Sequence, residues 1–141
     1  MRRDEGSTLP LVVLYGALGL VLIFLAVAAT SLYLERKRLF TLADGAALVG
    51  AEAFALDAVV ATPVGFRPTL RTEDVAAAVT TYLAGIPDPG FEALTVEHAG
   101  TDDERGATVI LSAVWRPPVL PMLAPDGIRI EVTSRARSVF G

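Results

Sequence analysis

The residues that could carry out chemistry in this chain are few and far apart. His98 is the only histidine among 141 residues, and there is no cysteine, so disulfides, thiolate metal sites and cysteine nucleophiles are excluded. The acidic run Asp102 to Glu104 lacks the alternating Asp or Asn positions and the distal Glu of an EF-hand loop. Lys37 is the only lysine and follows an apolar run, where it is expected to anchor a helix at a membrane surface. We therefore predict no enzyme, and no catalytic, cofactor-binding or metal-binding residue.

The element on which the remaining residues depend is an uncharged apolar run near the N-terminus. Leu9 to Leu34 are 26 residues without a charge, and as a helix they would be about 39 Å long, enough to cross a ~30 Å hydrocarbon core. The run is longer than a signal-peptide core, and a basic continuation follows it instead of a small-residue cleavage site. The sequence predicts a single membrane span that stays attached to the mature protein.

Composition separates the chain into parts. We expect a charged leader (1–7), a transmembrane helix (8–34), a continuation of that helix (35–61) and an α+β head (62–141). Residues 40–141 hold 13 acidic and 7 basic side chains, so the water-exposed part is negatively charged. A nucleic-acid partner is not expected, because neutralising a phosphate backbone needs a positive surface.

Beyond the span, apolar residues recur at alternating spacings of three and four, which predicts one packed stripe on a helix. Its members are Leu39, Leu42, Ala46, Val49, Ala53, Leu56 and Val60. Two partners for this seam remain open: the chain's own sheet, or other subunits.

The segment from Thr62 to Arg71 contains two prolines and a glycine and is expected to be a loop. A second amphipathic helix follows, with Thr72 as N-cap and with Gly85 and Pro87 ending it. Its expected buried face consists of Val75, Val79, Tyr82 and Leu83.

Three later runs alternate between apolar and polar residues, as strands with one covered face do. The inward sets are expected to be Leu94, Val96 and His98 in the first run, Val109, Leu111, Ala113 and Trp115 in the second, and Ile128, Ile130, Val132 and Ala136 in the third. The fold class is therefore α+β, with two helices and a three-stranded antiparallel sheet.

The order of parts in the first 54 residues resembles a known family. A charged leader ending in Gly6, then Ser7 and an apolar span, then Tyr33 with a basic cluster, then the segment from Leu39 to Ala53, is similar to the N-terminus of TadE/TadG-like proteins of the tight-adherence (Flp) pilus assembly system. The matching core positions are Ala43, Asp44, Ala46, Ala47, Leu48, Gly50 and Ala51.

The resemblance implies a bitopic, pilin-like envelope protein whose C-terminal domain lies outside the cytoplasmic membrane. It also implies cleavage by a prepilin peptidase after Gly6, leaving Ser7 as the first residue, and partners among other Tad pilus proteins. Prepilins usually hold Glu at the fifth mature position, where this chain has Leu11, so a minor-pilin-like or assembly role is expected. The alternative is a signal-anchored extracytoplasmic binding domain unrelated to pili.

Overall fold

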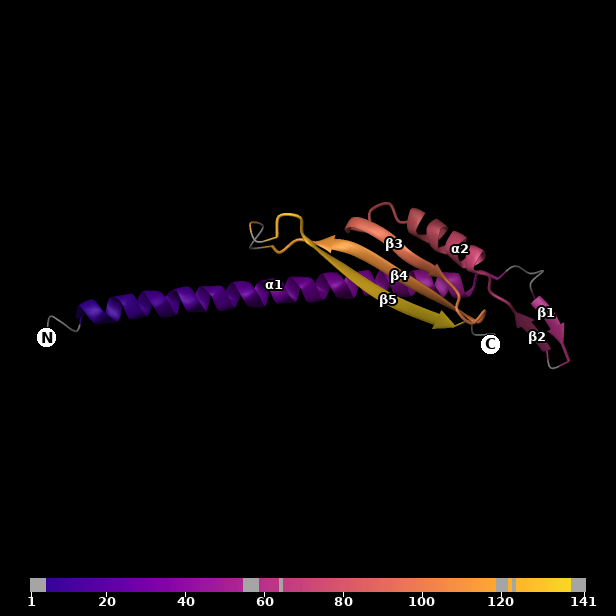
Figure 1. Ribbon diagram of the computed structural model, residues 1–141, viewed down its shortest axis with the longest axis horizontal. Helices are drawn as coiled ribbons and strands as arrows, with labels where there is room; N and C mark the ends of the chain where they lie inside the picture. Colours follow the sequence, from indigo (N-terminus) through magenta and orange to yellow (C-terminus); the bar gives the residue numbers. More distant parts are fainter. Residues whose placement is uncertain (1–4, 55–58, 64, 119–121, 123, 138–141) are drawn as a thin grey trace.

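The architecture is that of a computed structural model, which describes residues 5–54, 59–63, 65–118, 122 and 124–137. Its longest element is helix α1 (Glu5–Ala51), 47 residues, whose N-terminal half projects away from the rest of the molecule (Figure 1). The part of α1 from Thr8 onward is long and apolar enough to cross a membrane, and none of its most apolar 18-residue window is buried in the protein. The expected apolar helix is therefore present, beginning at Glu5, three residues before its predicted start at residue 8.

The head is a three-stranded antiparallel sheet covered on one face by helices. Strands β3 (Glu92–Gly100), β4 (Gly106–Trp115) and β5 (Ile128–Arg137) lie in that order, so β4 is central. Figure 1 shows the sheet lying along the C-terminal half of α1, with helix α2 (Thr72–Ala84) beside it. The predicted α+β class, with a second helix and three antiparallel strands, is confirmed.

The core lies between the helices and the inner face of the sheet. In β4 the alternate residues predicted to face inward are all buried, and in β5 the same holds for Ile130, Val132 and Ala136, whereas Ile128 at the strand end is 47% exposed. Charged side chains occupy the other face of β5, as the period of two requires. The two strongest sequence patterns therefore predicted the correct faces.

The predicted continuation of α1 to residue 61 is wrong. α1 ends at Ala51, where the backbone amide of Glu52 bonds the carbonyls of Leu48 and Val49 at 3.2 and 3.3 Å. Strands β1 (Val59–Thr62) and β2 (Gly65–Pro68) then form a hairpin in place of the helix end and of the predicted loop. β-branched residues favour this extended pairing, and Pro63 fits the turn between the strands.

The predicted inward face of β3 is also wrong in part. His98 is exposed because a register shift between Val96 and His98 interrupts the pairing with β4. Val96 pairs with the buried Leu111 and so keeps the predicted face, but it is 40% exposed on this edge strand. A bulge places two residues opposite one and so changes which face the following residues occupy. His98 pairs with Ile110 of β4. Ile110 alternates along β4 with the residues that were predicted to face inward, so His98 lies on the opposite face from them.

Helix α2 matches the prediction except at its first residue. It starts at Thr72, so the N-cap is Arg71, which makes no side-chain cap bond. The hydroxyl of Thr72 instead lies 3.4 Å from the amide of Thr101 and accepts its hydrogen bond. Val75 and Val79 are buried, while Tyr82 and Leu83 are partly buried against the core.

We expect Trp115→Ala to lower the free energy of unfolding by about 3–5 kcal/mol, because the indole is only 7% exposed and its removal leaves a cavity. Trp115→Phe should cost less, since it retains much of the ring volume. Far-UV circular dichroism of the full chain in detergent, followed through urea unfolding, measures both. Met122→Ala is the matched control, since Met122 is 94% exposed; equal stability of Trp115→Ala and this control would contradict the assigned packing.

Candidate functional site

The face of α1 that meets the sheet is built from small residues. Its buried stripe consists of Leu39, Ala43, Ala46, Ala47, Gly50 and Ala51. A Cβ atom on Gly50 would lie 3.0 Å from Val75 Cγ1 and 3.2 Å from Ala107 Cβ. The absence of side-chain bulk therefore lets α1 approach α2 and β4 closely, and a larger residue would push these elements apart.

The predicted seam overlaps this stripe but is rotated from it. Leu39 and Ala46 are fully buried, while Leu42 and Ala53 are half-buried and Val49 is 36% exposed. An α-helix advances 3.6 residues per turn, and a 3.5-residue repeat drifts around it. The predicted heptad was drawn through the larger aliphatic residues of the helix. The sheet instead packs on small residues, several of which come one position later in the sequence than a predicted seam residue.

Three members of the predicted seam, Ala53, Leu56 and Val60, come after the end of α1 at Ala51. Val60 lies in strand β1, so it cannot extend a stripe on a helix. Leu56 lies outside the described residues. The stripe observed inside the molecule therefore ends with Gly50 and Ala51.

Two polar contacts fasten α1 to the sheet. Ser134 on β5 donates a hydrogen bond from Oγ to Asp44 Oδ1 at 3.1 Å, and Trp115 on β4 donates from Nε1 to Ser31 Oγ at 3.2 Å. Together they set both the rotation and the axial position of the helix on the sheet. The sequence analysis predicted neither pair. The signals available for them were Asp44, an acidic residue in an alanine-rich helix, and Ser31, a serine in the uncharged run.

The outer face of the sheet holds a clamp between β3 and the residue after β4. Arg116 Nε and Nη2 donate to the two carboxylate oxygens of Glu92 at 2.7 and 2.6 Å. This hydrogen bonding lowers the pKa of Glu92 and raises that of Arg116. Nearby, Arg129 Nη1 donates to Glu97 Oε1 at 3.1 Å and to Ser112 Oγ at 2.6 Å. These contacts are structural, since they join neighbouring strands.

The acidic run is used to build a turn. Asp103 Oδ1 accepts hydrogen bonds from the amides of Arg105 and Gly106 at 3.1 and 2.9 Å, which lower the pKa of Asp103. Asp102 Oδ2 accepts from Thr108 Oγ1 at 3.2 Å. Within the part of the chain that the structure describes, no three His, Cys, Asp or Glu side chains gather where a metal ion could bind.

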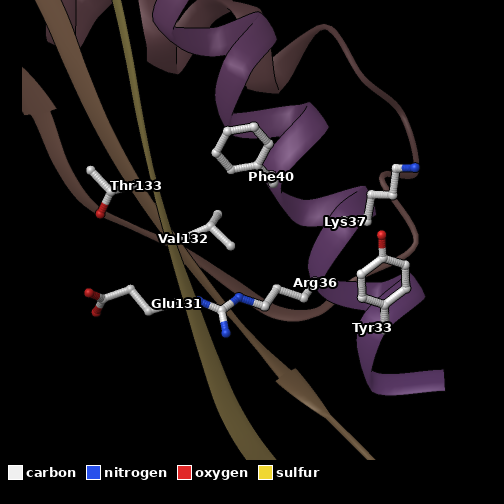
Figure 2. Close-up of a pocket in the computed structure, with 7 residues that line it drawn as sticks. All are labelled: Tyr33, Arg36, Lys37, Phe40, Glu131, Val132 and Thr133. Atoms are coloured by element: carbon white, nitrogen blue, oxygen red, sulfur yellow. The ribbon is translucent and has the colours of Figure 1, made fainter. Parts of the chain in front are cut away.

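An open groove of about 520 Å³ lies between α1 and β5. Its lining side chains are Tyr33, Arg36, Lys37, Phe40, Glu131, Val132 and Thr133 (Figure 2). Lys37, predicted to be an interfacial anchor, thus lies at the end of the uncharged run and also lines this groove.

The rest of the α1 surface is uncovered. Beyond the uncharged run, Leu48 is 52% exposed and Phe40 is 46% exposed. Inside the run, a Cβ atom on Gly16 or on Gly19 would meet no atom within 4 Å. Gly6 and Ser7 of the predicted processing site belong to the first turn of α1. The most apolar 18-residue window of the helix therefore presents an uncovered apolar surface, whereas Ala28, Ser31 and Leu32 at the end of the uncharged run contact the head.

One comparison with known proteins identifies part of the chain. Residues 6–53 match the family model Tad, "Putative Flp pilus-assembly TadE/G-like". No curated protein and no solved structure matches the chain. The matched range ends two residues after α1, so the family match and the long helix coincide. This chain therefore carries, in its N-terminal third, a TadE/G-like segment of the Flp pilus-assembly type.

Proposed function

We propose that this protein is a non-enzymatic, minor-pilin-like component of a Tad-type pilus, acting in its structure or its assembly. α1 crosses the cytoplasmic membrane once, and the head lies outside the cytoplasm. The observation that carries the proposal is the division of the TadE/G-like segment along one helix. Its first half has no buried residue in its most apolar window, whereas its second half is docked on the sheet through Ala43, Ala46 and Ala47.

Association in the membrane uses the uncovered half of α1. Without a hydrophobic driving force in lipid, helices associate through close contact at small residues. Gly16 and Gly19 supply such positions three residues apart, with open space at both. A neighbouring pilus or assembly helix can therefore approach the backbone of α1 there.

Association outside the membrane uses the side of α1 that the head leaves free. Of the residues in the family-like core, the alanines at 43, 46, 47 and 51 are buried, so they serve the internal interface. Leu48 belongs to the same core but is 52% exposed. Leu48 does not contribute to the core, and a polar residue at this exposed position would make the protein more soluble. It is therefore the best candidate for a contact with another subunit.

The leader fits processing by a prepilin peptidase, which would cut after Gly6 and release Ser7 as the new N-terminus. The hydrophobic Leu11 at the fifth mature position removes the carboxylate that main pilins carry there. A main pilin needs this carboxylate in every subunit along the filament, whereas a minor or assembly subunit does not form such a repeating contact. The proposed role is therefore a limited one within the pilus system.

The first prediction separates the internal interface from the contact with other subunits. We expect Leu48→Arg to abolish piliation while the membrane abundance of the protein stays within about twofold of wild type, because exposed substitutions change stability little. Ala46→Arg should instead deplete the protein, since a charge at a fully buried site must be desolvated or must displace the sheet. Immunoblots of membranes and electron microscopy of pili measure the two outcomes.

Glu52→Arg is the matched control for this experiment, because Glu52 is an exposed residue just beyond α1. It should leave both protein and pili unchanged. Normal piliation by Leu48→Arg would remove Leu48 from the proposed contact, and normal abundance of Ala46→Arg would contradict the internal docking.

The second prediction concerns topology. The chain has no cysteine, so a single introduced thiol reports its own location. Glu73→Cys, at a side chain that is 84% exposed, should react with a membrane-impermeant maleimide in intact cells with the outer envelope opened. In cells without the prepilin peptidase, in which the leader is retained, Arg3→Cys should react only after the cytoplasmic membrane is broken. The reverse pattern would place the head in the cytoplasm and overturn the proposed orientation.

The third prediction concerns processing. Co-expression with the cognate prepilin peptidase should shorten the chain by the six residues Met1 to Gly6, as intact-mass spectrometry of the membrane fraction would show. Gly6→Leu is the control and should remain full length. A full-length wild-type chain in cells that process another pilin would exclude the prepilin assignment, although the membrane anchor would stand.

A further inference from the structure

The groove between α1 and β5 carries an unbalanced positive charge. Arg36 and Lys37 from the helix line it, with Glu131 on the opposite wall, so its walls carry a net charge of plus one. Among the described residues, neither Arg36 nor Lys37 forms an ion pair, whereas the adjacent Arg38 pairs with Glu35 at 3.3 Å. Two cations held on one turn of a helix without a partner favour an anionic ligand.

The other walls of the groove combine hydroxyl groups with apolar surface. Tyr33 and Thr133 supply the hydroxyls, and Phe40 and Val132 supply the apolar wall. In Figure 2 the Arg36 side chain extends from the helix toward β5, and Tyr33 lies one turn nearer the N-terminus of α1. A ligand that fits this arrangement carries a phosphate, has hydroxyl or ester oxygens and has an apolar part on one side.

The position of the groove along α1 selects the source of that ligand. A helix needs about 20 residues to cross the hydrocarbon core, and the uncharged run that ends at Leu34 supplies 26. Tyr33 and Arg36 therefore lie at the level of the lipid headgroups, where aromatic and basic residues anchor membrane helices. Trp115 packs on Ser31 at nearly the same level, so the head rests close to the bilayer.

We propose that this groove binds the headgroup of an anionic phospholipid of the phosphatidylglycerol type. The phosphate binds the Arg36 guanidinium, which extends toward β5, while Lys37, whose side chain extends the other way from the helix, adds positive charge at the edge of the groove (Figure 2). The acyl chains run along the uncovered apolar surface of α1. The net positive charge favours a net negative headgroup over phosphatidylethanolamine, whose ammonium group would need Glu131 as its main partner. The head would thereby be oriented on the membrane by a lipid as well as by its helix, a property beyond the pilus role proposed above.

The test uses the full chain in detergent with defined lipids, measured by native mass spectrometry. Dioleoyl phosphatidylglycerol, phosphatidylethanolamine and phosphatidylcholine are added separately, and the fraction of protein carrying one lipid is compared. We expect the highest occupancy with phosphatidylglycerol. Arg36→Gln and Lys37→Gln should each weaken that binding about fivefold, which corresponds to about 1 kcal/mol for one basic residue at an anionic membrane surface.

Arg38→Gln is the matched control, because it removes the same charge at the same depth from a side chain that does not line this groove. It should leave phosphatidylglycerol binding unchanged, and Glu131→Gln should strengthen it. An equal loss in Arg38→Gln would mean that only the general charge of the helix matters and would overturn the groove as a site. Preferred binding of phosphatidylethanolamine that is lost in Glu131→Gln would overturn the anionic assignment.

Discussion

The close approach of α1 to the sheet is the constraint on which the rest of the molecule depends. Ala43, Ala46, Ala47 and Gly50 leave almost no side-chain volume on one face of the helix, and the valines of α2 and the inner residues of β4 occupy the space this creates. A face with so little bulk gains stability mainly through close packing, since tight contacts between small residues contribute many dispersion interactions. The paired Asp44 and Ser134 then select one rotation of the helix on that surface.

Docking the head on the same helix that is apolar enough to cross a membrane has a mechanical consequence. Because α1 is continuous from Glu5 to Ala51, the sheet keeps a defined position relative to the apolar run. The contact between Trp115 and Ser31 reaches into that run, so under the proposed membrane insertion the head would stand against the bilayer with little bare helix between them. The proposed lipid groove forms because β5 lies beside the basic turn of α1. The proposed subunit contact at Leu48 is available because the sheet does not cover the side of α1 on which Leu48 lies.

The accuracy of the sequence analysis followed the strength of each pattern. The buried face of β5 was predicted correctly except at Ile128 at the strand end. In β4 the residues predicted to face inward are buried, but the polar residues Thr108 and Ser112 are buried as well. The face of β3 was misassigned at His98, because the bulge before it changes the face without changing the composition. The end of α1 was predicted ten residues too late, because the alanine-rich sequence beyond Ala51 keeps a helix-like spacing of apolar residues. Val59 and Val60 favour a strand, but this local preference is weak over so short a segment.

The sequence by itself determined the long apolar helix, the second helix and the alternating strands of an α+β fold, since each of these depends on composition and periodicity within a continuous stretch. The TadE/G-like segment was found by its resemblance to a known family. The tertiary structure alone decided which face of α1 packs on the sheet, that Ser134 bonds Asp44 and Trp115 bonds Ser31, and that Arg36 and Lys37 share a groove with Glu131. These pairs join residues 80 or more positions apart, so no local spacing encodes them. They arise from the register of the sheet and from the small volume that lets the helix lie against it.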